Sequence, residues 1–108
     1  MNTRISYMYR DAANYKIHLE EVIAGEMTQE MQDRFFEKYD ELDPFYPANL
    51  GFKADTFVTR GYAPYDDDPD CHEIEGFDLV RAKPTVNMTV EEFLAAFESG
   101  LATTVPLA

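Results

Sequence analysis

The sequence predicts an α+β fold, in which a small antiparallel sheet of three to four strands is covered on one face by two amphipathic helices. Apolar and polar side chains alternate in residues 4–10, 15–25 and 71–80, as in strands with one buried face. In residues 28–42 and 88–100 the apolar side chains instead recur every three to four positions, which is the period of a helix. Two apolar helix stripes can cover one apolar sheet face, so the two patterns fit together.

The first two strands predict a β-hairpin. Residues 11–14, with the sequence Asp-Ala-Ala-Asn, form its turn, because Asp and Asn side chains bond nearby backbone groups. The second strand begins with Tyr15 on its apolar face. Its pattern then shifts toward Val22 and Ile23, which predicts a bulge near Glu20–Glu21.

The first helix is expected over residues 28–42, with Thr28 as its N-cap and Pro44 beyond its end. Its apolar stripe comprises Met31, Phe35, Tyr39 and Leu42. The second helix has the clearest local signal in the chain. Thr89 and Glu92 predict a capping box, Met88 and Phe93 a hydrophobic staple, and Gly100 the C-terminal end.

Between the first helix and the strand at 71–80, residues 43–70 follow no period. The segment is rich in aromatic and acidic residues, and such long irregular segments are usually functional or disordered. We expect a short edge strand at 55–60 within it. In the strand at 71–80, His72 and Ile74 share a face and Gly76 marks a bulge, after which Phe77 and Leu79 resume the apolar face.

Length and charge restrict the classes of function. A chain of 108 residues predicts one domain spanning residues 1–108, and the formal net charge of −12 disfavours direct binding to nucleic acid or anionic membranes. The same charge favours a basic protein surface as partner. Cys71 is the only cysteine, and neither a signal peptide nor a membrane span is predicted, so we expect a cytoplasmic protein.

Four segments, taken in order, carry a resemblance to a known family: YMYRDAANYK, then Pro47 to Gly51 with the pattern P-x-x-L-G, then YDDDPDCHEIEGF and finally TVEEFLAAFE. This order resembles that of a family of small uncharacterised bacterial proteins of roughly this length. Its members often have an aromatic residue where this chain has Cys71. The resemblance implies a single bacterial domain and no established activity, and it transfers no catalytic residues.

The acidic run before Cys71 suggests a metal site as one hypothesis, with Asp66, Asp68, Asp70 and His72 as ligands. An EF-hand does not fit, because a loop beginning at Asp66 has Cys71 where that motif needs Gly. Zinc fits poorly as well, since Cys71 and His72 would point to opposite faces of a strand. No cofactor is predicted.

Catalysis by Cys71 is disfavoured, because neighbouring carboxylates raise a thiol pKa. His72 is better explained as a histidine at the edge of the core with one hydrogen-bond partner. The chain contains none of the phosphate-binding, dinucleotide-binding, hydrolase or zinc-protease motifs. We therefore expect a protein that is not an enzyme.

The leading hypothesis is an acidic protein-interaction module. Carboxylates recur on the polar face of the helix at 28–42 and again in the run after Tyr65, and carboxylates can occupy sites built for phosphates. Aromatic residues beside them, such as Phe45, Tyr46, Tyr62 and Tyr65, would supply anchors if they are exposed, and the alternative is that they cover the sheet as part of the core. The residues expected to bind a partner are Glu30, Asp33, Glu37, Tyr62, Tyr65, Asp66, Asp67 and Asp68.

Small acidic inhibitors of restriction or CRISPR effectors have a similar composition, so an antagonist that mimics nucleic acid is the most specific form of this hypothesis. The alternatives are the metal- or ligand-binding protein described above and a structural or housekeeping domain.

Overall fold

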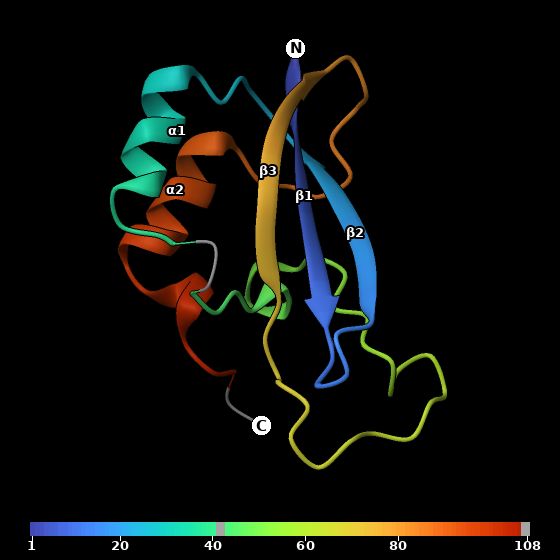
Figure 1. Cartoon of the computed structure of the whole chain (residues 1–108). Coiled ribbons are helices and arrows are strands. Elements are labelled where there is room, and N and C mark those ends of the chain that lie inside the picture. The colour runs from blue at the N-terminus through green and yellow to red at the C-terminus, as the bar shows by residue number, and fades with distance from the viewer. Residues whose placement is uncertain (41–42, 107–108) are drawn as a thin grey trace.

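The computed structural model describes residues 1–40 and 43–106 (Figure 1). The elements occur in the order β1 (Asn2–Arg10), β2 (Lys16–Ile23), α1 (Gln29–Phe36), η1 (Pro47–Leu50), β3 (Glu73–Val80), α2 (Val90–Glu98) and η2 (Leu101–Thr103), where η1 and η2 are short 3-10 helices. This order confirms the predicted α+β fold, with three strands in the described residues.

The three strands form an antiparallel sheet in the order β2-β1-β3, so β1 is central. On β1, Tyr7 lies opposite Leu19 of β2 and Ile74 of β3. Both helices lie on the same side of this sheet (Figure 1). The alternation of β1 sends Ile5, Tyr7 and Tyr9 toward them, because successive side chains of a strand point to opposite faces.

The core forms where this face meets the helices. Phe93 of α2 is fully buried and packs its ring against Phe35 of α1 and Phe77 of β3. Burying a side chain of this size contributes about 2–3 kcal/mol. From the long loop, Phe45 and Phe52 add rings against Tyr7. The sheet face is thus covered by two helices and part of the loop.

The bulge predicted near Glu20–Glu21 is wrong. The pairing of β1 with β2 runs without a shift from Thr3 opposite Ile23 to Arg10 opposite Lys16. Glu21 keeps the inward phase and is buried. Val22 is also buried on the other face, because Thr85 crosses the edge of β2 and bonds its backbone. The sequence pattern of β2 therefore suggests a change of phase only because the neighbours Glu21 and Val22 are both buried, on opposite faces of the strand.

The bulge predicted at Gly76 is confirmed in β3. Ser6 pairs with Gly76, and the next residue, Tyr7, pairs with Ile74, which leaves Glu75 as the extra residue. Leu79 departs from its predicted burial, because 48% of its surface is exposed. The predicted face of β3 therefore holds for Ile74 and Phe77 but not at the far end of the strand.

The first helix is shorter than predicted, since α1 ends at Phe36. Thr28 caps it as expected, with its side chain accepting a hydrogen bond from the Met31 amide. After Glu37 the chain turns, and the Asp43 carboxylate accepts a hydrogen bond of 2.8 Å from the Asp40 amide. Side-chain bonds of this kind compete with helical ones, which explains the early end. The predicted positions 41 and 42 lie outside the described residues.

The second helix confirms the predicted capping box and the predicted glycine after its end. Thr89 and Glu92 form the capping box, each accepting a hydrogen bond of 3.1 Å from the backbone of the other. Gly100 follows the helix with φ of 84°, a left-handed conformation that glycine adopts at low cost.

The predicted edge strand at 55–60 is wrong. This segment is a turn in which the side chains of Thr56 and Thr59 bond each other's backbone amides, which occupies groups that a sheet ladder would need. Of the two alternatives for Phe45 and Tyr46, exposed anchors or core residues, the structure shows the second. Phe45 is fully buried and Tyr46 is 7% exposed, because Phe45 forms a two-bond bridge with His72 that draws this part of the loop into the core.

Candidate functional site

The long loop is fixed to the sheet through side chains of the central strand. The Tyr7 hydroxyl donates a hydrogen bond of 2.7 Å to the Lys53 carbonyl oxygen, and the Tyr9 hydroxyl donates one of 2.8 Å to that of Pro69. The Asp68 carboxylate then accepts hydrogen bonds from the amides of Ala12 and Tyr65. The acidic end of the loop is thereby held against the hairpin turn that joins β1 to β2.

A cavity of about 350 Å³ lies where the loop meets this turn. Its aromatic wall includes Tyr15, Tyr62 and Tyr65, which are 65%, 65% and 54% exposed. The remaining described residues that line it are Asp11, Phe57, Ala63 and Asp68. We call this the tyrosine cavity. Exposed tyrosines are common anchors in protein interfaces, because each offers a large ring and a polar hydroxyl.

The ring of Tyr62 is connected to the core by edge-to-face packing. Phe57 contacts Tyr62 with ring centres 5.9 Å apart, and it contacts the buried Tyr9 at 6.1 Å. Burial, followed by the negative charges of Asp68 and Asp11, raises the pKa of Tyr9 above its usual value. The tyrosine cavity therefore has a supported wall and a negative electrostatic field.

The acidic run beside the tyrosine cavity divides into bound and free carboxylates. Asp68 accepts the two amide hydrogen bonds described above, and Asp70 accepts one of 3.2 Å from the Tyr46 hydroxyl. Asp66 and Asp67 are exposed and have neither a hydrogen bond nor an ion pair with any residue that the structure describes. Asp68, predicted to bind a partner, thus also has a structural task, whereas Asp66 and Asp67 are available.

The predicted residues on α1 form a second, separate acidic patch. Glu30, Asp33 and Glu37 are all exposed, and Asp33 accepts a hydrogen bond of 3.0 Å from Gln29. Figure 1 shows α1 near one end of the molecule and the segment that follows residue 62 beyond the other end of the sheet. The structure brings Tyr62 and Tyr65 together with Asp66–Asp68, but it does not bring the α1 residues to them.

On the outer face of the sheet, by contrast, the arginines pair with local acids. Arg4 lies 3.0 Å from Asp78 and 3.7 Å from Glu20. On the same face, Arg10 lies 3.0 Å from Glu73. These arginines are thus engaged with local acids, whereas Glu30 and Glu37 on α1 and Asp66 and Asp67 in the acidic run have no ion pair with a described residue.

The metal hypothesis fails at His72. This side chain is 2% exposed, and its Nε2 lies 3.0 Å from the Asp55 carbonyl oxygen. Burial lowers the pKa of His72 below its usual value. The ring lies in the core beside Tyr7 and Tyr9 rather than with Asp66, Asp68 and Asp70. Within residues 1–40 and 43–106, no group of three or more potential ligands could hold a metal ion.

Cys71 lies in a similarly unreactive setting. Burial, and then the negative charge of Asp70, raises the pKa of its thiol above the usual value. The sequence predicted that neighbouring acids raise this pKa, but the structure shows that burial is the larger cause. A thiol held protonated is a poor nucleophile, because the thiolate is the reactive species.

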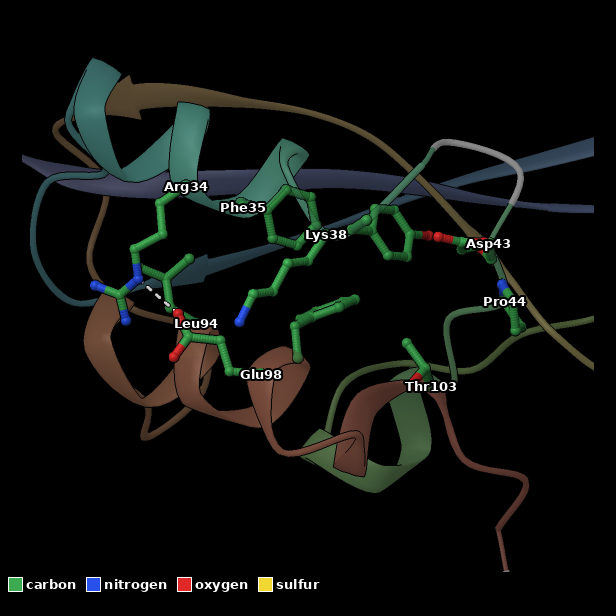
Figure 2. A pocket seen from close by; sticks show the side chains of 10 residues that line it. Arg34, Phe35, Lys38, Asp43, Pro44, Leu94, Glu98 and Thr103 are labelled. Atoms are coloured by element: carbon green, nitrogen blue, oxygen red, sulfur yellow. Dashed lines mark hydrogen bonds and ion pairs between the residues drawn. The ribbon is translucent and has the colours of Figure 1, made fainter.

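A second cavity, of about 300 Å³, lies between α1, α2 and the turn that follows α1 (Figure 2). Its floor is apolar, with Phe35, Leu94 and Phe97 among the lining residues. Figure 2 shows Lys38 extending into it and Arg34 paired with Glu98. Two basic side chains, Arg34 and Lys38, face two acidic ones, Asp43 and Glu98, so this cavity favours neither an anion nor a cation.

Sequence reasoning missed two residues of the tyrosine cavity, Tyr15 and Asp11. Tyr15 was expected on the apolar face of β2, but the strand begins one residue later and Tyr15 belongs to the turn. Asp11 accepts a hydrogen bond of 2.8 Å from the Tyr15 amide and orients this turn. The turn signal at residues 11–14 pointed to this location, but only the fold shows that the long loop returns to it.

In the described part of the chain, no helix combines the length and the apolar character needed to cross a membrane. Comparisons with protein-family models, with curated proteins and with solved structures each gave no match to this chain.

Proposed function

We propose that the chain is a non-enzymatic interaction module that binds a basic surface of another protein through its acidic loop. The observation that carries the proposal is that the exposed rings of Tyr62 and Tyr65 adjoin the carboxylates of Asp66 and Asp67, which have no partner among the described residues. Specific interfaces combine buried aromatic anchors with complementary charge, and this surface offers both. We place the protein in the cytoplasm, where a single unpaired cysteine such as Cys71 is usual.

The separation of the two acidic patches assigns them different tasks. Asp66 and Asp67 stand beside aromatic anchors and make direct contacts with the partner. Glu30, Asp33 and Glu37 add to the long-range field that steers a basic protein toward the molecule. The proposal includes the case in which the partner's surface normally holds nucleic acid, since Lys and Arg pair with carboxylates as they do with phosphates.

The test is a titration of the full chain with a short Lys- and Arg-rich peptide, followed by isothermal calorimetry and amide chemical shifts. Binding should weaken as ionic strength rises from about 0.01 M to about 0.15 M, where the Debye length falls from about 30 Å to about 8 Å. The largest shifts should occur in residues 62–70 and in the hairpin turn, not on α1.

Two double variants separate direct contact from total charge. Asp66→Asn with Asp67→Asn should weaken binding by about 3- to 10-fold, the loss expected for two partly exposed charge pairs. Glu30→Gln with Glu37→Gln changes the net charge equally, and these side chains also have no partner among the described residues. This control should change affinity by less than about twofold. Equal losses in both would contradict a site on the loop.

The nucleic-acid form of the proposal has its own readout. The chain should release a labelled DNA duplex from a protamine-like Arg-rich peptide, and the Asp66→Asn, Asp67→Asn variant should do so less well than the α1 variant. If both variants release DNA equally, the effect comes from net charge and the mimicry proposal is wrong.

A further inference from the structure

The described lining of the tyrosine cavity contains no lysine or arginine. Four of its residues carry aromatic rings: Tyr15, Tyr62, Tyr65 and Phe57. Aromatic ring faces attract cations, and the attraction grows when the cation is shielded from water. The lining therefore favours a ligand group that is positively charged and can pack against aromatic rings.

The carboxylates around the tyrosine cavity are fixed before any ligand arrives. Asp68 is held by the amides of Ala12 and Tyr65, and Asp11 is held by the amide of Tyr15. A carboxylate has about four acceptor positions, so both retain capacity for a charged donor. Asp66 and Asp67 follow Tyr65 in the chain outside this lining, and they add two carboxylates that have no partner in residues 1–40 and 43–106.

The size of the tyrosine cavity indicates a single side chain as occupant. Its volume of about 350 Å³ is at the lower end of the range of ligand pockets, which begins near 300 Å³. A helix or a strand of a partner would exceed it. One extended side chain entering between Tyr15 and the loop would not.

We infer that the tyrosine cavity receives an arginine side chain of the basic partner, an inference that rests on the proposed function and names its anchoring residue. Arginine fits better than lysine for three reasons. Its guanidinium is less strongly hydrated, it stacks flat on aromatic rings, and its planar fork of donors pairs with carboxylates in two-bond geometry. The ring of Tyr62, supported by Phe57, supplies the stacking surface.

The experiment compares two peptides of equal length and equal charge, in which the basic positions are all arginine or all lysine. Calorimetry on the full chain should show the arginine peptide binding about fivefold more tightly, the increment expected for stacking on a partly shielded ring. In amide spectra, the arginine peptide should shift the signals of Ala12, Tyr15 and Tyr65 more than the lysine peptide does.

Leucine substitutions test whether the tyrosine rings of the cavity cause the preference for the arginine peptide. Tyr62→Leu and Tyr65→Leu remove the aromatic faces while keeping apolar bulk, and both side chains are exposed, so the fold should persist. Tyr15→Leu, also at an exposed position, provides an independent variant. The arginine preference should fall to about onefold in these variants, while the charge-driven binding common to both peptides remains. Phe36→Leu changes an exposed ring on α1 that is 47% exposed, and should retain the preference.

The outcomes separate this inference from the proposed function. If the unsubstituted chain binds the arginine and lysine peptides equally through the loop, the inference is overturned and the proposed function stands. If the arginine preference survives all three tyrosine substitutions, the inference is overturned as to its site. If neither peptide binds, both are overturned.

Discussion

The carboxylate of Asp68 accepts a hydrogen bond of 2.9 Å from the backbone amide of Ala12, a residue 56 positions earlier in the chain. This contact joins the acidic loop to the hairpin turn and closes one side of the tyrosine cavity. We expect Asp68→Ala to loosen the loop and to lower the free energy of unfolding by about 1–2 kcal/mol, because two amides lose their partner. Hydrogen exchange at Ala12 and Tyr65 should accelerate in native conditions.

Asp67→Ala is the matched control for this prediction. It removes the adjacent carboxylate, which has no hydrogen bond in the described part of the chain, and should leave exchange at Ala12 unchanged. Unchanged protection of the Ala12 amide in Asp68→Ala would show that the carboxylate does not hold the loop.

The burial of His72 predicts a loss of stability in mild acid. The Asp55 carbonyl can only accept, so Nε2 of His72 carries the proton and Nδ1 stays unprotonated in the core, where no described residue is its partner. Burial lowers the pKa of this ring in the folded state. The unfolded chain therefore binds the proton more readily, and stability should fall as pH drops below about 6.5, the ordinary histidine value.

Urea unfolding at several pH values between about 7.5 and about 5 measures this effect, since pH 6.5 lies inside that window. His72→Gln retains a donor for the Asp55 carbonyl but has no proton to bind, so its stability should depend less on pH. His18→Gln removes the exposed histidine instead and should keep the decline. A decline in His72→Gln that is as steep as in the unsubstituted chain, or steeper, would contradict the assignment.

Glu21 provides a third prediction, because it is a buried carboxylate on the core face of β2. It is 5% exposed and accepts hydrogen bonds of 2.8 Å from the Lys53 amide and 2.7 Å from the Thr85 hydroxyl. Glu21→Ala should lower the free energy of unfolding by about 1–3 kcal/mol, since it leaves the partly buried Lys53 amide and the Thr85 hydroxyl without this acceptor. Thermal and urea unfolding measure this loss.

Two further variants test whether the loss comes from the buried hydrogen bonds of Glu21. Glu21→Gln keeps an acceptor oxygen and should lose clearly less stability than Glu21→Ala. Glu20→Ala removes the exposed neighbour that lies 3.7 Å from Arg4, and should remain within about 0.5 kcal/mol of the unsubstituted chain. Similar losses at positions 20 and 21 would mean that burial does not determine the effect.

Cys71 should react slowly with alkylating reagents at neutral pH. Burial and the charge of Asp70 raise the pKa of the thiol, so the reactive thiolate is scarce. Asp70→Asn removes the charge but can still accept the Tyr46 hydroxyl, and should accelerate alkylation about two- to fivefold. If the Cys71 thiol reacts faster than a free cysteine at pH 7, this prediction is wrong and a nucleophilic role for Cys71 is supported.

Local signals in the sequence predicted those parts of the fold that local interactions determine. The capping box of Thr89 and Glu92 depends on neighbours within a few positions, and the bulge was indicated by the glycine at position 76 itself; both are confirmed. Some of the errors arise from local side-chain bonds, as at Asp43 and Thr56, and others concern contacts between distant segments. Val22 is buried because Thr85, 63 positions away, covers its strand edge, and no period in β2 could reveal this.

The candidate site likewise contains some features that the sequence could predict and others that depend on contacts between distant segments. Exposure of Tyr62, Tyr65, Asp66 and Asp67 could be predicted, because polar and aromatic residues without a period indicate a surface loop. The choice between exposure and burial of Phe45 could not, since it depends on a backbone bridge to His72 across 27 positions. Nor could the role of Tyr15, which depends on where the far end of the loop returns.

The central position of β1 has a consequence for how the chain folds. Its first partner, β2, follows after a short turn, but its second partner is remote, as the 74 positions between Arg4 and Asp78 show. Closing that distance costs chain entropy before any pairing is gained, so the hairpin should form early and the third strand should dock late. Until then one edge of β1 stays open to other chains, and refolding at high concentration should be the step at which this protein aggregates.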